Sequence, residues 1–220
     1  FPRWMAEKEI PARRYVPAFI LMQLGNVTFY AGLLGNKHLL AAGVLLSLCG
    51  WAIAMYALLH VLRHTKPMDK RHPIIALIAL ALGWSGVAAY LVWLLSEQSL
   101  WLDYSLQAGI WFFLLPVFFN IGHRMIPFFT ASAAIRCRID RPDWPLWVIL
   151  ACSAGHGALQ LADASEWLWL VDAPLALTAF YLGYAWNLLR SLAVPMVAVL
   201  HIGVAWLGVA ALLFSVQSAT

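Results

Sequence analysis

Seven apolar runs, separated by short polar connections, dominate this chain of 220 residues. Each run is about 20 residues long, the length that an α-helix needs to cross the hydrocarbon layer of a bilayer. The runs predict an all-α fold in which a single domain, residues 1–220, forms a polytopic transmembrane helix bundle of about seven spans. The expected spans are 15–35, 38–62, 73–95, 105–132, 144–163, 167–187 and 193–215.

The composition points to the same class of protein. Hydrophobic residues make up 63% of the chain and charged residues only 11%, whereas a soluble domain carries about 25% charged residues. We therefore expect an integral membrane protein whose main partner is the lipid bilayer. The formal net charge is +4, but the basic residues fall in the short connections between apolar runs. This distribution does not favour nucleic acid as a partner.

The basic residues also predict an orientation. Of 14 Lys and Arg, twelve lie in connections on one side of the expected bundle, and by the positive-inside rule that side is cytoplasmic. Phe1 then lies on the cytoplasmic side, and the odd number of spans leaves Thr220 outside. The outer side carries Lys37 as its one basic residue, together with five acidic residues: Glu97, Asp103, Asp163, Glu166 and Asp172.

Two polar residues interrupt the fourth apolar run far from either end. His123 and Arg124 follow the apolar residues 106–119 and precede residues 131–135, which are again mostly apolar. An arginine at the bilayer centre costs about 2.5–3.5 kcal/mol on insertion scales. A cost of that size is seldom retained for packing alone, so we interpret the pair as part of a functional site.

Three histidines on three different spans are expected at similar depth. At 1.5 Å per residue, His123, His201 and His156 lie about 15, 12 and 18 Å from the cytoplasmic ends of their helices. Neutral imidazoles from separate helices are suitable ligands for a haem iron or a copper ion. We therefore consider all three as metal ligands. The alternative is a buried histidine that donates a hydrogen bond to the backbone of a neighbouring helix.

Helical spacing groups the polar residues of the fourth run into two stripes. His123 and Thr130 are seven residues apart on one stripe, and Asn120 and Arg124 are four residues apart on the next. The guanidinium group of Arg124 is suited to hold a haem propionate or another buried anion by paired hydrogen bonds. The alternative is an ion pair between Arg124 and an acid outside this sequence.

Two motifs in the chain resemble a known family. The segment Gly122-His123-Arg124-Met125-Ile126-Pro127-Phe128-Phe129-Thr130 is similar to the G-[GH]-R-x-[IV]-P-x-F-T signature of the NnrS family, and Val199-Leu200-His201-Ile202-Gly203-Val204-Ala205-Trp206-Leu207 resembles its LH-[IVL]-G-x-x-WL segment. The resemblance covers the middle and later part of the family. Because the chain also starts at Phe1 without an initiator Met, we expect a fragment of a longer protein, which the resemblance implies has about twelve spans.

The resemblance implies a bacterial inner-membrane protein that holds haem and copper and acts in nitric oxide metabolism, denitrification or the response to nitrosative stress. It implicates His123, Arg124, Pro127 and Thr130 in the first motif and His201 and Trp206 in the second. Nitric oxide is the implied small-molecule ligand. The residues that we expect to bind a cofactor are therefore Arg124, His201, His123, Asn120 and Thr130, and the expected metal ligands are His201, His123 and His156.

A second function remains open on the sequence alone. A transporter of a small solute or of copper would also need a polar pathway through the bundle, for which Asn120, Arg124, His156 and Gln160 are the candidates. Neither interpretation identifies catalytic residues, and the sequence does not decide whether the protein is an enzyme.

Overall fold

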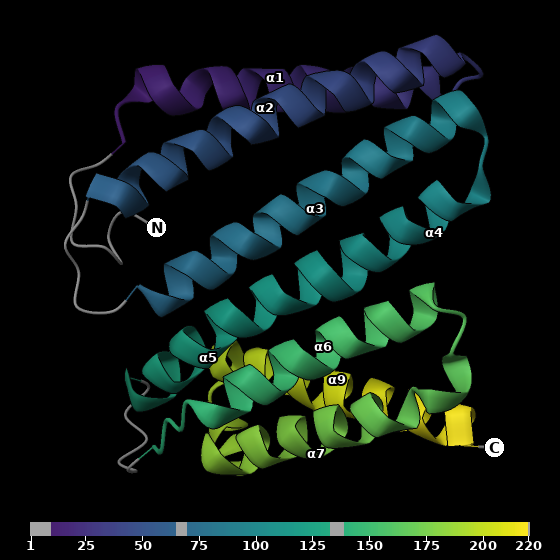
Figure 1. Ribbon diagram of the computed structural model, residues 1–220. Coiled ribbons are helices and arrows are strands. Elements are labelled where there is room, and N and C mark those ends of the chain that lie inside the picture. Colours follow the sequence, from purple (N-terminus) through teal and green to yellow (C-terminus); the bar gives the residue numbers. More distant parts are fainter. Residues whose placement is uncertain (1–9, 65–69, 133–138, 220) are drawn as a thin grey trace. The chain divides into compact units, whose positions relative to one another are not determined.

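The computed structural model describes residues 10–64, 70–132 and 139–219, and these form helices joined by short turns without any strand (Figure 1). Five of the helical segments are long and apolar enough to cross a membrane: Lys37–His64, Arg71–Ser96, Ser99–Ser132, Ser165–Ala185 and Pro195–Ala219. The all-α membrane fold expected from the sequence is thus confirmed. The chain divides into two compact units, residues 1–114 and 115–220.

The number of spans is the part of the prediction that the structure supports only partly. Each of the seven expected runs contains a helix, but α1 and α6 are not among the five segments with the length and hydropathy of a span. The polar residues Gln23, Asn26 and Thr28 lower the hydropathy of α1, and His156 and Gln160 lower that of α6, whose 18 residues are long enough for a span. Seven spans therefore remain a prediction.

Unit 1 contains α1 (Ala12–Gly32), α2 (Lys37–His64), α3 (Arg71–Ser96), α4 (Ser99–Gln107) and the π-helical turn η2 (Ala108–Leu114). Helices α1 and α2 form a hairpin in which glycines bring the two backbones together. A Cβ atom on Gly43 would lie 2.5 Å from the backbone nitrogen of Phe29, so only glycine fits at this position. Small residues permit such close packing where helices meet inside a bilayer.

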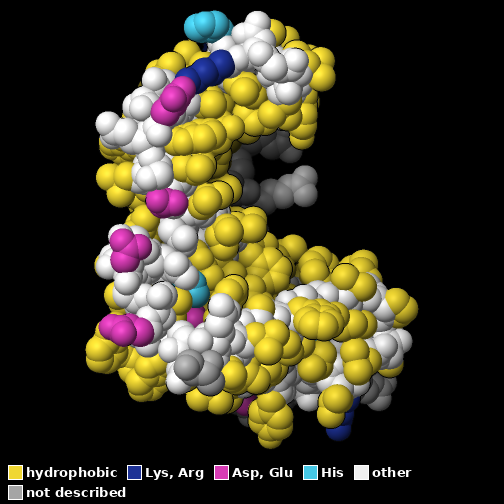
Figure 2. All heavy atoms as spheres, turned by 90° about the vertical axis from the view of Figure 1, so that its right-hand side faces the viewer, with side chains coloured by type: hydrophobic (Ala, Val, Ile, Leu, Met, Phe, Trp, Pro, Cys, Tyr) yellow, Lys and Arg dark blue, Asp and Glu magenta, His cyan; other side chains and the backbone are white. Residues whose placement is uncertain are grey.

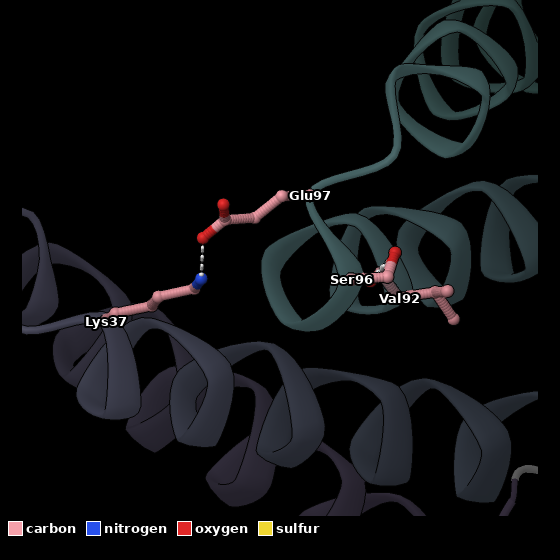
Figure 3. Close-up of polar contacts among 4 residues, drawn as sticks. All are labelled: Lys37, Val92, Ser96 and Glu97. Atoms are coloured by element: carbon pink, nitrogen blue, oxygen red, sulfur yellow. Dashed lines mark hydrogen bonds and ion pairs between the residues drawn. The ribbon is translucent and has the colours of Figure 1, made fainter.

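Polar contacts fix the ends of the helices in unit 1. The side chain of Asn36 accepts hydrogen bonds from the backbone N–H groups of His38 and Leu39, which caps the start of α2. Next to this cap, Lys37 Nζ lies 2.6 Å from the Glu97 carboxylate, in the connection between α3 and α4 (Figure 3). The indole of Trp84 on α3 donates to the Leu48 carbonyl of α2, which ties the two helices together along their length.

Unit 2 contains α5 (Leu115–Ser132), α6 (Trp144–Leu161), the short turn η3 (Ser165–Trp167), α7 (Trp169–Ala185), α8 (Leu188–Ser191) and α9 (Pro195–Ala219). Its core lies where α7 packs on α9 and α6, and Ala179 and Leu182 are completely buried there. Other apolar side chains of the same helices point outward, such as Leu177 and Val199, each 70% exposed. Such exposure is expected of side chains that face lipid, and hydrophobic side chains cover much of the face that Figure 2 shows.

Candidate functional site around His201

The two sequence motifs meet inside unit 2. Thr130, in the last turn of α5, and His201, in the second turn of α9, are both buried, and Thr130 Oγ1 lies 3.0 Å from His201 Nε2. The Thr130 hydroxyl also lies 2.8 Å from the backbone carbonyl of Ile126 and donates its proton to that oxygen. Because the hydroxyl has one proton to donate, it accepts the hydrogen bond from His201, and Nε2 of the imidazole carries the hydrogen.

This arrangement leaves the other ring nitrogen of His201 available. With the hydrogen on Nε2, Nδ1 has a lone pair, and it is buried with no hydrogen-bond partner among the residues that the structure describes. Buried polar atoms without a partner are rare in native proteins, and each calls for an explanation. An unprotonated ring nitrogen is what a metal ion requires of an imidazole.

His123 has different surroundings, although it belongs to the same stripe of α5. Its Nε2 donates a hydrogen bond of 2.8 Å to the carbonyl of Pro142, just before α6. The ring also packs edge-on against Trp186, at 6.0 Å between centroids. The contact with a backbone carbonyl is the alternative that we considered for a buried histidine, so its role as a ligand remains a prediction.

The second stripe of α5 is split between the interior and the surface. Asn120 is completely buried, whereas Arg124, one turn further along, is exposed on this chain. Arg124 can therefore reach an anion that lies beside unit 2, whether this is a cofactor group or an acidic side chain outside this sequence. The assignment of Asn120 and Arg124 as cofactor-binding residues stays a prediction.

His156 pairs with Asp172, an acid that the sequence predicts on the outer side of the protein. Its Nδ1 lies 2.7 Å from Asp172 Oδ1, and the two side chains are 1% and 0% exposed. We expected Asp172 among the acidic residues outside the membrane and missed this pair. The available signal was its position in an apolar run, three residues after the start of α7 and at the same end of the bundle as His156.

The prediction that the three histidines lie at a common depth is wrong for His156. Its ring packs against Phe214 of α9, at 5.6 Å between centroids. Phe214 lies 13 residues beyond His201 on the same helix, which is about 20 Å along the helix axis. His156 and His201 therefore cannot bind one metal ion, and the described residues contain no group of three or more His, Cys, Asp or Glu side chains that could hold one.

Together, the apolar helices and the buried imidazoles define a polytopic α-helical membrane protein with polar side chains inside a helix bundle. The family model described as NnrS protein matches residues 1–220, the whole of this sequence. The chain therefore belongs to the NnrS family. No curated protein and no solved structure matches it.

Proposed function

We propose that the protein is a haem- and copper-associated inner-membrane protein that acts in nitric oxide metabolism or in the response to nitrosative stress. Membership of the NnrS family supports this class of function. The observation that carries the proposal is the state of His201: Thr130 accepts a hydrogen bond from its Nε2–H, and its buried Nδ1 has no partner among the described residues.

The residues present fit such a group. Neutral imidazole is a common ligand of copper and of haem iron. Metal-binding histidines usually donate their other ring N–H to a neighbouring acceptor, which fixes the tautomer and the orientation of the ring. Thr130 is that acceptor for His201, and in our proposal Nδ1 is the atom that binds the metal. A bound haem or copper would supply the redox-active centre at which nitric oxide binds.

Other predicted residues have supporting roles in this proposal. Arg124 would bind an anionic group of the cofactor, and Asn120 and His123 of α5 would complete the polar lining of the cofactor site. We also propose that the Phe1 side faces the cytoplasm of a bacterial cell. The support for this orientation is the location of the basic residues, twelve of 14 in connections on one side of the seven expected spans.

A transporter of a small solute or of copper is the second candidate. A polar pocket of about 270 Å³ favours the transporter. It lies where α6 and α9 end, next to η3, and its lining includes Gln160 and Gln217. A visible absorption spectrum of the purified full-length protein separates the two candidates. A Soret band that shifts on addition of nitric oxide supports the first, whereas a colourless protein that takes up solute in liposomes supports the second.

The variant His201→Ala tests the proposed ligand directly. We expect bound haem or copper per protein to fall while the protein still inserts into the membrane. Thr178→Val is the matched control, because Thr178 is also buried in unit 2 but its hydroxyl donates only to Pro174 of its own helix. Unchanged haem and copper in His201→Ala would assign His201 to the packing of α9 on α5 and overturn the proposal for this residue.

A further inference from the structure

A pocket of about 390 Å³ lies beside the end of α7, where the chain turns into α8 and then into α9. This volume is typical of a pocket that binds a small molecule. Most of the wall is apolar, and its apolar residues come from these three helices: Ala179, Phe180, Gly183, Leu188, Leu189 and Ala205. None of the histidines proposed as metal ligands lines the pocket, so it is not part of the site around His201.

The polar side chains of this pocket all come from residues 184–190. Asn187 has a left-handed backbone (φ 60°) at the point where the chain leaves α7, and the turn brings Arg190 of α8 to the same pocket as Tyr184 of α7. Arg190 is the only Lys, Arg, Asp or Glu in the sequence from Ala173 to Thr220. This side of the pocket therefore carries a positive charge, and the group that complements it is an anion.

A second pocket, of about 270 Å³, adjoins the first and is lined by apolar side chains. Leu188 and Ala205 line both pockets. The rest of the second wall consists of Leu192 and of three residues on one face of α9: Ile202, Trp206 and Val209. The indole of Trp206 is 68% exposed, as expected of a side chain that faces lipid. Two apolar pockets thus meet on the lipid-facing surface of unit 2, and one of them contains a cationic group.

The occupant that matches this surface has one anionic group and two apolar chains. A guanidinium group binds phosphate by paired hydrogen bonds, and its five donors allow this in addition to contacts within the protein. Basic pockets between membrane helices on the cytoplasmic side bind anionic lipid headgroups. Arg190 lies between the sixth and seventh expected spans, on the side that the basic residues predict to be cytoplasmic. A second copy of the chain, bound through the same face, would bring another Arg190 to this surface instead of an anion.

We propose that the two adjoining pockets bind one anionic phospholipid. Arg190 binds the phosphate, and Tyr184 and Asn187 donate hydrogen bonds to the headgroup. The two acyl chains lie in the two pockets and separate at Leu188 and Ala205. The site needs neither haem nor copper, and it goes beyond the function proposed above.

Native mass spectrometry of the full-length protein, supplied with equal amounts of phosphatidylglycerol and phosphatidylcholine, tests the charge. We expect one retained phosphatidylglycerol in preference to phosphatidylcholine, and retention about fivefold weaker in Arg190→Gln, the effect of one basic residue at a lipid surface. Arg63→Gln is the matched control, because it removes the same charge from an exposed position at the end of α2 in the other unit. Equal retention in the wild type and Arg190→Gln would overturn the proposal.

A second pair of variants tests the apolar walls and leaves Arg190 in place. Ala205→Leu puts a larger side chain where the two pockets meet. Ala210→Leu is the control, since Ala210 is exposed on the same helix and lines neither pocket. Phosphatidylglycerol with a photoreactive acyl chain should crosslink to residues 188–209 in the wild type and in Ala210→Leu, and several-fold less in Ala205→Leu. Equal crosslinking in both variants would overturn the pockets as the site of the chains.

The same experiments identify other occupants of this surface. If a further helix of the full-length protein or a second copy of the chain covered the pockets, the photoreactive lipid would not crosslink to residues 188–209 of the wild type. If inorganic phosphate displaced phosphatidylglycerol, the site would take a free anion. Either result would overturn the assignment of a phospholipid.

Discussion

Thr130 and His201 are 71 residues apart in the sequence, and their side chains are in hydrogen-bond contact at 3.0 Å. Each belongs to one of the two motifs that resemble the NnrS family. The contact places the end of α5 against the start of α9 and fixes which nitrogen of the imidazole carries the hydrogen. Both residues are buried, so their contact is part of the interior of unit 2.

Thr130→Val should destabilise the protein by removing this contact. Interhelical hydrogen bonds in membrane proteins average about 0.6 kcal/mol and reach about 1.7 kcal/mol, and we expect the loss in free energy of unfolding to lie in this range. Unfolding in detergent micelles measures it. Thr178→Val removes a hydroxyl that bonds only its own helix and should cost less. Equal losses in both variants would show that the Thr130–His201 bond adds no stability.

Substitutions of Arg124 should show whether its guanidinium group holds an anionic group of a cofactor by paired hydrogen bonds or forms a simple ion pair with an acid. Arg124→Lys keeps the charge but loses the planar arrangement of donors, so paired hydrogen bonds to a propionate would be lost while an ion pair could persist. Arg124→Gln removes the charge and should lower cofactor content in either case. Haem and copper per protein are the measurement. Normal content and normal protection against nitric oxide in both variants would exclude Arg124 from the functional site.

The ion pair Lys37–Glu97 should make a pH-dependent contribution to stability. The pKa of Glu97 lies below its usual value of 4.5, first because the Lys37 ammonium group donates a hydrogen bond to the carboxylate and then because of the Lys37 charge. A lowered pKa in the folded state means that the contribution is complete above the usual pKa and disappears as the pH falls through the lowered one.

The contribution of the Lys37–Glu97 ion pair to stability can be measured by thermal unfolding of Glu97→Gln and of the wild type, from neutral pH down to a pH below the lowered pKa of Glu97. We expect a small difference in midpoint at neutral pH, because both side chains are solvent-exposed, and no difference at pH values below the lowered pKa. High salt should also reduce the difference. A difference that persists unchanged in acid would assign the effect of the Glu97→Gln substitution to something other than the ion pair.

Cysteine labelling in intact cells should test the orientation. Cys137 falls in the basic connection after the fourth expected span, outside the described residues, and we predict that it faces the cytoplasm. A membrane-impermeant thiol reagent should therefore leave it unlabelled until the cells are opened. Cys152, which is buried in α6, serves as an internal control that stays unlabelled in both conditions. Labelling of Cys137 from outside would reverse the assigned orientation.

The helices were largely predictable from the sequence, because each apolar run is long enough to satisfy its own backbone hydrogen bonds within a bilayer. The run expected at 38–62 is α2 (Lys37–His64), and the one expected at 193–215 is α9 (Pro195–Ala219). The least apolar runs were harder to judge. Polar residues within α1 and α6 leave the status of both helices as spans open, since hydropathy alone does not reveal which polar side chains a helix buries against its neighbours.

Thr130 and His201 were also recognised individually, from motifs that resemble a family. Their contact was not predictable, because it depends on how α5 packs on α9, and no local pattern fixes the rotation of two helices that are separated by 62 residues in the sequence. Counting residues along separate helices predicts the wrong depth for His156, because such a count assumes helices of equal tilt and offset. The packing of α6 on its neighbours places His156 against Phe214 and not near His201.

The sequence by itself determined the class of protein, the approximate limits of its helices and the residues of the two motifs, because these follow from local hydropathy and residue chemistry. The tertiary structure decided which polar groups meet. It placed the Thr130 hydroxyl on one nitrogen of His201, left the other nitrogen without a described partner, and buried Asp172 against His156. Such contacts join helices that are distant in the chain, and only the packing of their side chains determines the register in which they meet.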